Sequence, residues 1–457
     1  MSFGKLLDRF VARRPVAVLF RAMLERALSA ERMNELFATT AVEQYDHRIA
    51  FATVVDVLGE VVNCQQKSVN AAYKAAGKEA VGASIAALYE KLAGVEPAVS
   101  EALVRSTANE LAAIIDMALP RRKPLLPGYS LRILDGKLLD GTEHRTAPTR
   151  PHPEAVLPGR LCAMLDPERE LVLDVIACED GHAAERTLMA RMFSRLRPGD
   201  CLLADRNYCT KSYVWSLQEQ GIKFILRQHA GDCEVELLGP RKRLGCGDTG
   251  VVYEQTARVV YSDGRTLPLR RITVELAQQT RDGDREIHLL TNLPVKIGGR
   301  RIADLYRQRW RIEQTFQAVA QALRGEVNTL GYPRAALLGY CLALTTFNLL
   351  STVKACIRAA HKEHAPAKLS TYYLADEVVR AWDGLDLMIP AAHWERRFVH
   401  TPLKTFVRDL LAIARHVDAH RFATTTRGPK KPRKQLPRGK STHLSTYRLL
   451  QSARQSE

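Results

Sequence analysis

The sequence predicts an α/β protein that carries a helical region at its N-terminus and an antiparallel β insertion near its middle. Three changes of pattern support this fold class. Residues 1–120 place apolar side chains at helical spacing, with few β-branched alternations. Residues 129–227 alternate strand-like and helical runs, which is typical of a sheet flanked by helices. Residues 228–294 contain alternating runs joined by Gly-Asp and Asp-Gly turns, which predicts antiparallel hairpins.

The N-terminal region is predicted to hold several short helices before a boundary at the Pro-bearing residues 120–128. Helical periodicity is clearest in residues 48–62, 68–76, 84–92 and 100–119. Residues 68–92, with Ser84 as a helix N-cap, fit a helix-turn-helix whose second helix would enter a groove of DNA. An ordinary helical bundle explains the same residues, and both interpretations stay open.

Two strand-like runs in the α/β region each deliver an aspartate. Asp135 follows the run 131–134, and Asp205 follows the run 202–204. Strands are expected at residues 130–134, 161–165, 171–177, 201–204 and 223–227, and helices at residues 182–196 and 211–220. Because functional groups gather at the carboxyl ends of strands in α/β sheets, we expect Asp135 and Asp205 to lie close together.

The insertion is followed by a helical remainder of this α/β region, residues 295–420. Insertion strands are expected at residues 233–238, 250–260, 267–276 and 286–290. A long helix is predicted over residues 302–324, because no Pro or Gly occurs between Gly299 and Gly325. Residues 335–357 are strongly apolar at helical spacing, and their Cys, Thr, Asn and Lys residues favour a core helix over a membrane span.

Tyr306, Arg309 and Glu313 lie three and four residues apart in this long helix. The spacing places a phenol, a guanidinium and a carboxylate along one helix face. Such a row can meet a phosphate and a metal ion together. In an isolated helix, a solvated Arg309–Glu313 pair would be the better interpretation. The two aspartates upstream, Asp135 and Asp205, favour the functional interpretation, in which the row binds a phosphate and a metal ion.

Excess positive charge points to a polyanionic partner. The net charge is +17, and residues 421–457 hold ten Lys or Arg and one acid, so about half of the excess lies in this tail. The tail is rich in Pro and Gly, and we expect it to be flexible and to contact phosphates through Lys430, Lys431, Arg433 and Lys434.

The remaining composition favours a soluble cytoplasmic protein. Hydrophobic residues make up 46% of the chain, and residues 1–30 lack the compact apolar run and cleavage site of a signal peptide. Nine Cys, an odd number, are dispersed without a Cys-x-x-Cys pair. This pattern argues against a disulfide framework and a zinc finger, and it fits a reducing compartment.

Asp135, Asp205 and Glu313 are the carboxylates expected to perform chemistry. Three negative charges brought together need a compensating cation, and hard oxygen ligands suit Mg²⁺ or Mn²⁺. Two such ions can stabilise the attacking and the leaving oxygen of a phosphoryl displacement. Asp140 competes with Asp135, since residues 138–141 repeat the strand-Asp-Gly pattern, but Asp135 follows the more regular alternation.

The chain resembles the DDE transposases of bacterial insertion sequences, in the group named for a Tyr-Arg-Glu-Lys signature. The resemblance rests on the two strand aspartates, the β-rich insertion and the Tyr-x2-Arg-x3-Glu helix. Short phrases also match, namely Leu134-Asp-Gly-Lys, Asp180-Gly-His, Ala204-Asp-Arg-Asn-Tyr, Thr291-Asn-Leu-Pro and Leu330-Gly-Tyr-Pro. The resemblance covers most of residues 40–450.

The resemblance implies a ribonuclease-H-like catalytic core split between residues 129–227 and 295–420, with Asp135, Asp205 and Glu313 as catalytic and metal-binding residues. It further implies that Tyr306 and Arg309 contact phosphates of the transposon end. The expected activity is cut-and-paste DNA transposition with Mg²⁺, for which Mn²⁺ can substitute. The expected partners are the terminal inverted repeats and target DNA, bound by a homodimer. No membrane is implied.

One position departs from the signature, because its Lys should come seven residues after Glu313, where this chain has Ala320. Arg324, one turn further, is the candidate replacement. The departure keeps open a catalytically spent DNA-binding protein, and a metal-dependent nuclease without strand transfer would share the same carboxylates. The family can also form a DNA hairpin with help from an aromatic residue of the insertion, for which Tyr253 and Tyr261 are candidates.

Overall fold

A nine-stranded mixed sheet organises the part of the chain that the structure describes. The computed structural model describes residues 4–44, 48–120, 123–140, 150, 157–229, 231–280 and 283–424. Met1–Ala423 form one compact unit, so the predicted N-terminal, α/β, insertion and helical regions pack together. The strand order is β3-β2-β1-β4-β5-β9-β8-β7-β6. The protein is therefore a mixed α/β fold.

The first five strands form the part of the sheet that carries both aspartates. They are β1 (Ser130–Leu138), β2 (Arg160–Asp166), β3 (Leu171–Cys178), β4 (Asp200–Ala204) and β5 (Lys223–Arg227). β1 pairs with β4 in parallel, and β4 pairs with β5 in parallel. β2 and β3 add antiparallel strands beyond β1. All five side chains of β4 are buried, as expected for a central strand with both faces covered.

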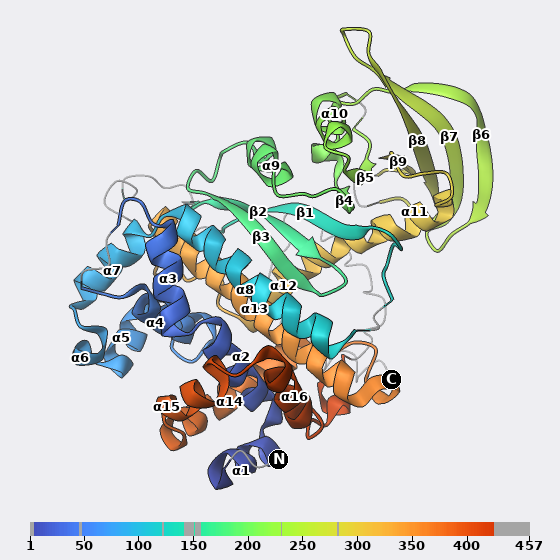
Figure 1. Cartoon of the computed structure of the whole chain (residues 1–457). Helices are drawn as coiled ribbons and strands as arrows, with labels where there is room; N and C mark the ends of the chain where they lie inside the picture. The colour runs from blue at the N-terminus through green and yellow to red at the C-terminus, as the bar shows by residue number, and fades with distance from the viewer. Residues whose placement is uncertain are drawn as a thin grey trace, which may run out of the picture. The chain divides into compact units, whose positions relative to one another are not determined.

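The insertion continues the same sheet. It consists of β6 (Glu236–Cys246), β7 (Gly250–Val260), β8 (Thr266–Leu276) and β9 (Glu286–Thr291), all antiparallel to their neighbours. β9 joins the insertion to the core by pairing antiparallel with β5, with Ile225 opposite Thr291. Figure 1 shows β6, β7 and β8 projecting beyond the core strands. The insertion therefore extends the sheet from β5, the neighbour of the strand β4 that precedes Asp205.

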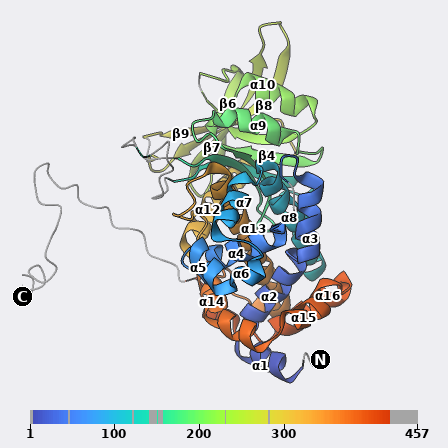
Figure 2. The ribbon, with the colours of Figure 1, turned by 90° about the vertical axis from the view of Figure 1, so that its left-hand side faces the viewer.

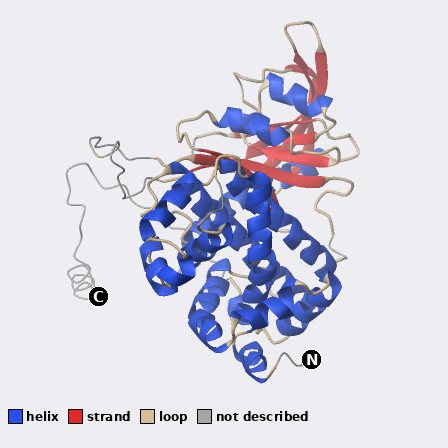
Figure 3. Ribbon diagram, turned by 60° about the vertical axis from the view of Figure 1, so that its left-hand side comes forward, coloured by secondary structure: helices blue, strands red, loops and turns tan. Residues whose placement is uncertain are grey.

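Helices cover both faces of the core strands. On one face lie α9 (Glu185–Phe193) and α10 (Lys211–Glu219), which pack on Leu134, Leu202 and Phe224. On the other lie α8 (Pro97–Ala118), α12 (Trp310–Ala322) and α13 (Pro333–His361), which pack on Ile133 and Leu203. Figures 1 and 3 show this layering, with most helices on the α13 side of the sheet. Alternation along β1 therefore sends Ile133 and Asp135 towards α12, and Leu134 towards α9.

The long helix α13 is core, as its sequence predicts. Among the described residues, it alone is long and apolar enough to cross a membrane, and its most apolar window is entirely buried within the protein. Its Asn348 is fully buried yet satisfied, since the amide exchanges two 2.8 Å hydrogen bonds with the backbone of Val172 on β3. A buried amide with both bonds made aligns the helix with the sheet.

The remaining helices form a bundle on the α13 side. The N-terminal helices are α1 (Lys5–Arg13), α2 (Pro15–Ala27), α3 (Ala30–Thr40), α4 (Phe51–Val62), α5 (Val69–Ala76), α6 (Lys78–Val81) and α7 (Ile85–Gly94). The C-terminal helices are α14 (Thr371–Met388), α15 (Ala391–Trp394) and α16 (Leu403–Ala414), and α14 and α16 pack against α2 (Figure 2). The predicted N-cap Ser84 is confirmed, because its hydroxyl accepts from the Ala87 amide of α7.

Two details of the predicted elements were wrong. Asp135 does not end its strand, because antiparallel pairing with β2 carries β1 on to Leu138. The helix predicted over residues 302–324 is divided into α11 (Gly299–Tyr306), the 3₁₀ turn η3 (Arg307–Arg309) and α12. The 3₁₀ turn lies where Tyr306 and Arg309 approach Asp205 and Asp135. Residue spacing within the helix cannot predict these contacts with distant segments.

Candidate active site

Asp135 and Asp205 occupy corresponding places on two neighbouring parallel strands. The β1–β4 ladder ends with Ile133 opposite Leu203. Two residues further along each strand direction come Asp135 and Asp205, both of the parity that faces α12. Asp205 is also the residue that precedes the short 3₁₀ helix η2 (Arg206–Tyr208). The strand pairing therefore brings together two acids that are seventy residues apart in the chain.

The third acid comes from α12, which packs against β1. Tyr306 is the last residue of α11, Arg309 ends η3, and Glu313 lies in the first turn of α12. Buried Ile312 and Val319 fix the helix on the sheet. This packing turns the row of Tyr306, Arg309 and Glu313 towards the aspartates.

Arg309 lies among the three acids. Its Nη1 is 2.8 Å from Glu313 Oε1 and 3.8 Å from Asp135 Oδ2. Burial works against its charge, but the nearby groups Tyr306, Asp205, Glu313 and Asp135 together hold the pKa of Arg309 above its usual value. Arg309 is therefore the common counterion of the predicted catalytic residues.

Asp205 is held by two further groups. The Tyr306 hydroxyl donates to its Oδ1 over 3.4 Å, and Arg227 Nη1 from the end of β5 lies 3.9 Å from the same oxygen. Tyr306 is itself buried in the site, which raises the pKa of its hydroxyl, and Asp205 adds to that rise. Tyr306 therefore acts here as a neutral hydrogen-bond donor.

Asp135 is a largely buried carboxyl group with other carboxylates nearby. Burial raises the pKa of its carboxyl to about 7, Arg309 opposes that rise, and the carboxylates of Glu185 and Glu313 add to it. Only 20% of the Asp135 side chain is exposed. A further cation beside Asp135 would relieve this repulsion.

The donor atoms fit a divalent metal ion in chemistry. Carboxylate oxygens are the preferred ligands of Mg²⁺ and Mn²⁺. In the ligand-free geometry Arg309 lies between the acids, and within the described residues no three His, Cys, Asp or Glu side chains are grouped closely enough to hold a metal. Asp135, Asp205 and Glu313 would hold the ion once the guanidinium shifts from their midst.

Arg309 also has an unused donor. Its Nε is buried and has no hydrogen-bond partner among the described residues. A buried, unpaired N–H group is unfavourable unless a ligand completes it. Next to it, Trp310 is 60% exposed, and the Arg309 guanidinium lies 5.6 Å from the centre of the Trp310 ring. An anion beside Arg309 would satisfy this donor.

Several other predicted residues lie elsewhere. Arg324 follows α12, and its guanidinium donates to the backbone oxygen of Gln66 over 2.6 Å instead of facing the acids. Ala320 is exposed on α12. Asp140 has a side chain that is 82% exposed, and Lys137 lies 3.6 Å from it. The tail residues Lys430, Lys431, Arg433 and Lys434 lie outside the described part of the chain.

The two tyrosines of the insertion make intramolecular contacts. The Tyr253 hydroxyl donates to Glu275 over 3.0 Å, and Arg241 stacks 3.9 Å from its ring centre. Tyr261 donates to the backbone oxygen of Lys211 and packs edge-on against Trp215. Neither contact brings a tyrosine to the carboxylates.

Sequence reasoning missed Arg227, Glu185 and the exposed Trp310. Arg227 ends the strand next to β4, so its strand-end position was the available signal. The sequence around Glu185 gave no such signal, because only the packing of α9 brings Glu185 to β1.

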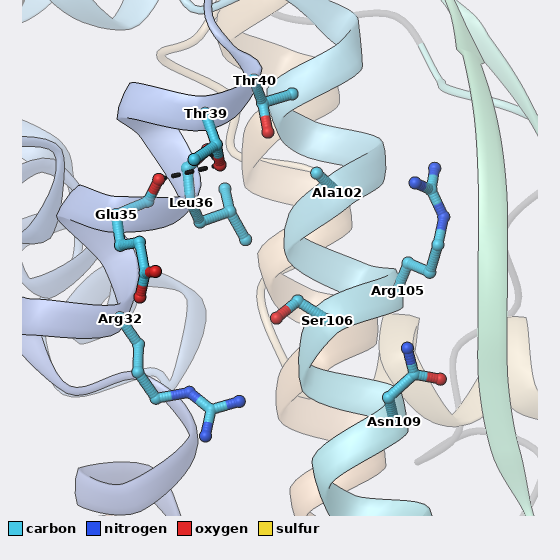
Figure 4. Close-up of a pocket in the computed structure, with 9 residues that line it drawn as sticks. All are labelled: Arg32, Glu35, Leu36, Thr39, Thr40, Ala102, Arg105, Ser106 and Asn109. Atoms are coloured by element: carbon cyan, nitrogen blue, oxygen red, sulfur yellow. Dashed lines mark hydrogen bonds between the residues drawn. The ribbon is translucent and has the colours of Figure 1, made fainter.

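A polar hollow of about 490 Å³ lies between α3 and α8 (Figure 4). Its lining residues, including Arg32, Glu35 and Arg105, contain none of the acids of the candidate active site.

Comparison with known proteins adds independent information about residues 126–349. These residues match the family model described as "Transposase DDE domain". No curated protein matches the chain significantly. A solved structure, "Cryo-EM structure of piggyBac transposase synaptic complex with hairpin DNA (SNHP)", shares 10% identity over 94% of this chain and 91% of that chain. Its TM-score of 0.39 is too low to support a common fold.

The matched segment spans β1 to most of α13 and contains Asp135, Asp205 and Glu313. The family match and the convergence of these acids on Arg309 are independent observations. Together they support a DDE-type transposase.

Proposed function

We propose that this protein is a DDE transposase of the bacterial insertion-sequence type, acting in the cytoplasm on the ends of its own element. Its core would be ribonuclease-H-like, and it would cut and rejoin DNA with Mg²⁺ or Mn²⁺ bound by Asp135, Asp205 and Glu313. The observation that carries the proposal is the convergence of these three acids, from two strands and a helix, on Arg309.

Two phosphoryl-transfer steps, a hydrolysis and a transesterification, would use this site. In the first, water attacks a phosphodiester at the transposon end, a P–O bond breaks, and a 3′-hydroxyl and a 5′-phosphate are released. In the second, that 3′-hydroxyl attacks a phosphodiester of target DNA, a new P–O bond forms, and the displaced 3′-oxygen takes up a proton. Divalent ions, when bound, polarise the phosphodiester and stabilise the attacking and leaving oxygens.

The residues of the chain would position the substrate and the acids. Tyr306 holds the Asp205 carboxylate as a neutral donor. Arg309, once released from Glu313, presents its unpaired Nε and its Nη1 to a phosphate, and the planar guanidinium suits two-point binding of phosphate oxygens. The same guanidinium therefore serves the acids before DNA binds and the phosphate afterwards.

The residues that flank Arg309 in the sequence, Arg307, Trp310 and Arg311, line a hollow that carries cations and an aromatic ring but none of the three acids. The hollow, of about 430 Å³, is lined by the cations Arg301, Arg307, Arg311 and Lys368, by the acids Asp248 and Asp304, and by Trp310. Basic residues interleaved with an exposed aromatic ring suit contact with a nucleic-acid backbone and an unstacked base. We propose that the DNA end crosses this hollow, and that a homodimer pairs two ends.

The test combines the purified full chain, labelled terminal inverted repeats taken from the DNA that flanks the gene, a supercoiled target and Mg²⁺. Strand-transfer product is the expected result. Nicking without joined product would instead identify a nuclease. A shifted but uncut probe would identify a catalytically spent DNA-binding protein.

A further inference from the structure

Glu185 approaches the site from the face of the sheet opposite to α12. It is the first residue of α9, and its carboxyl group lies against β1 at Gly136, the residue after Asp135. A Cβ atom added at Gly136 would come within 2.7 Å of the Glu185 carboxyl carbon, closer than real Cβ contacts allow. A larger residue at this position would push the Glu185 carboxylate away from β1.

A buried tyrosine holds Glu185 in this place. The Tyr208 hydroxyl donates to Glu185 Oε1, and Tyr208 is 1% exposed. Tyr208 ends η2, three residues after Asp205. The pair therefore connects Gly136 of β1 with the turn after β4, the same two segments that supply Asp135 and Asp205.

The charge of Glu185 has little compensation. Its Oε2 faces Arg160 Nη2 at 3.9 Å, too far for a hydrogen bond, while Arg160 Nη1 donates to the backbone oxygen of Ala183. The Glu185 side chain is only 18% exposed. A partly buried carboxylate with one distant cation is placed where an additional cation would be favourable.

Glu185 and Asp135 lie at neighbouring positions of β1, on opposite faces of the strand. Gly136, which meets the Glu185 carboxyl group, is the residue directly after Asp135. Pairing between β1 and β4 stops at Ile133, so beyond that point no described strand pairs with β1 on the β4 side. An ion at this open edge would therefore have an acid on each face of β1.

We propose that Glu185 is a fourth carboxylate of the divalent-metal site, held by Tyr208 and admitted by Gly136. The inference rests on the proposed function, because that function supplies the metal ion. It assigns to α9 a part in metal binding that neither the Asp-Asp-Glu pattern nor the Tyr-Arg-Glu spacing contains. Its consequence is that the site depends on both faces of the sheet.

The test measures Mn²⁺ binding to the full chain without DNA, by electron paramagnetic resonance of the free ion. Glu185→Gln keeps the volume and can still accept from Tyr208, but it lacks the charge. We expect about tenfold weaker Mn²⁺ binding, in line with the 10–100-fold effects of metal-site neighbours. Gly136→Ala keeps the charge but displaces the carboxylate, and it should weaken binding as well. Glu219→Gln, on exposed α10 surface, is the matched control and should bind normally.

The outcomes separate this inference from the proposed function. Wild-type Mn²⁺ affinity in Glu185→Gln, together with weakened binding in Asp135→Asn, would overturn the role of Glu185 and leave the three-acid site standing. Unchanged affinity in Asp135→Asn and Asp205→Asn would overturn the three-acid site itself. Circular dichroism of each variant shows whether the fold is intact, and Glu185→Asp supplies a second charge-retaining variant that should bind better than Glu185→Gln.

Discussion

Two clusters of acids in this protein look alike in charge but differ in construction. One is the site of Asp135, Asp205 and Glu313 around Arg309. The other surrounds a cavity of about 360 Å³ between α2, α4 and α14, where Glu25, Asp56, Glu60 and Asp386 surround Arg21. In both, burial raises carboxyl pKa values, to about 7 for Asp135 and to about 7 for Glu60. A raised pKa therefore does not distinguish the two.

The clusters differ in what surrounds the arginine. Both arginines pair with a glutamate one turn away, and both keep a buried Nε without a hydrogen bond among the described residues. Arg21 lies among helices only, and it stacks 4.6 Å from the Trp382 ring centre on α14. Arg309 instead lies beside aspartates that two neighbouring parallel strands, β1 and β4, bring together. Acids that meet at such strands mark a reactive site better than charge alone.

The largest expected effect separates the clusters by activity. Asp135→Asn, Asp205→Asn and Glu313→Gln should each reduce cleavage of transposon-end DNA by at least about 10³-fold, because each removes a metal ligand. Binding of the end should persist in a gel-shift assay. Asp56→Asn and Glu60→Gln are the matched controls and should cleave within about twofold of wild type. Substantial cleavage by any of the first three variants would remove that residue from the site.

Replacing the two central arginines should give the next largest difference. Arg309→Lys keeps the charge but loses Nε and the planar fork, so cleavage should fall about 10²-fold. Arg21→Lys changes the other cluster in the same way and should leave cleavage unchanged. Both rates come from single-turnover assays with excess protein. Equal losses in the two variants would mean that Arg309 acts through folding alone.

The pH dependence of stability should also distinguish the clusters. Asp135 has a folded-state pKa near 7, above its ordinary value of 3.8, so the folded protein holds this proton more tightly than the unfolded chain. Its contribution is fully present below about pH 4 and is lost as the pH rises through about 7. In EDTA, Asp135→Asn should therefore gain about 2 kcal/mol over wild type between pH 5 and pH 8.

Urea unfolding at the two pH values measures this difference. Glu60→Gln should flatten the same pH dependence from the other cluster, because the pKa of Glu60 is also raised, by burial first and then by Asp386 and Asp56. Mg²⁺ should remove the effect of Asp135 and leave that of Glu60. Parallel pH profiles for wild type and Asp135→Asn would contradict the raised pKa that burial gives Asp135.

The smallest effect is expected at Arg324. Because its guanidinium bonds to Gln66 and lies away from the acids, Arg324→Ala should lower stability by about 1 kcal/mol and change cleavage less than threefold. Urea unfolding and the single-turnover assay measure both quantities. A large loss of cleavage at unchanged stability would restore Arg324 as the substitute for the missing signature lysine.

Local patterns predicted much of the fold. Periodicity located the strands and helices of the core, the later insertion strands and the buried helix α13 to within a few residues, but β6 runs eight residues beyond its predicted end at Leu238. The divided helix at Arg307–Arg309 and the extension of β1 past Asp135 were missed. The strand extension depends on pairing with β2, and the helix division falls beside Tyr306, which donates to Asp205, so both lie where segments distant in the sequence meet.

The sequence by itself determined which residues are available for the candidate active site: two strand aspartates, a Tyr-x2-Arg-x3-Glu helix and an Ala at the position of the signature lysine. Only the tertiary structure decided that Arg309 lies between all three acids, that Arg324 turns away to Gln66, and that Glu185 reaches β1 through the space at Gly136. The reason is physical. Spacing along a chain fixes the direction of a side chain on its own helix or strand, whereas the meeting of charges depends on how those elements pack.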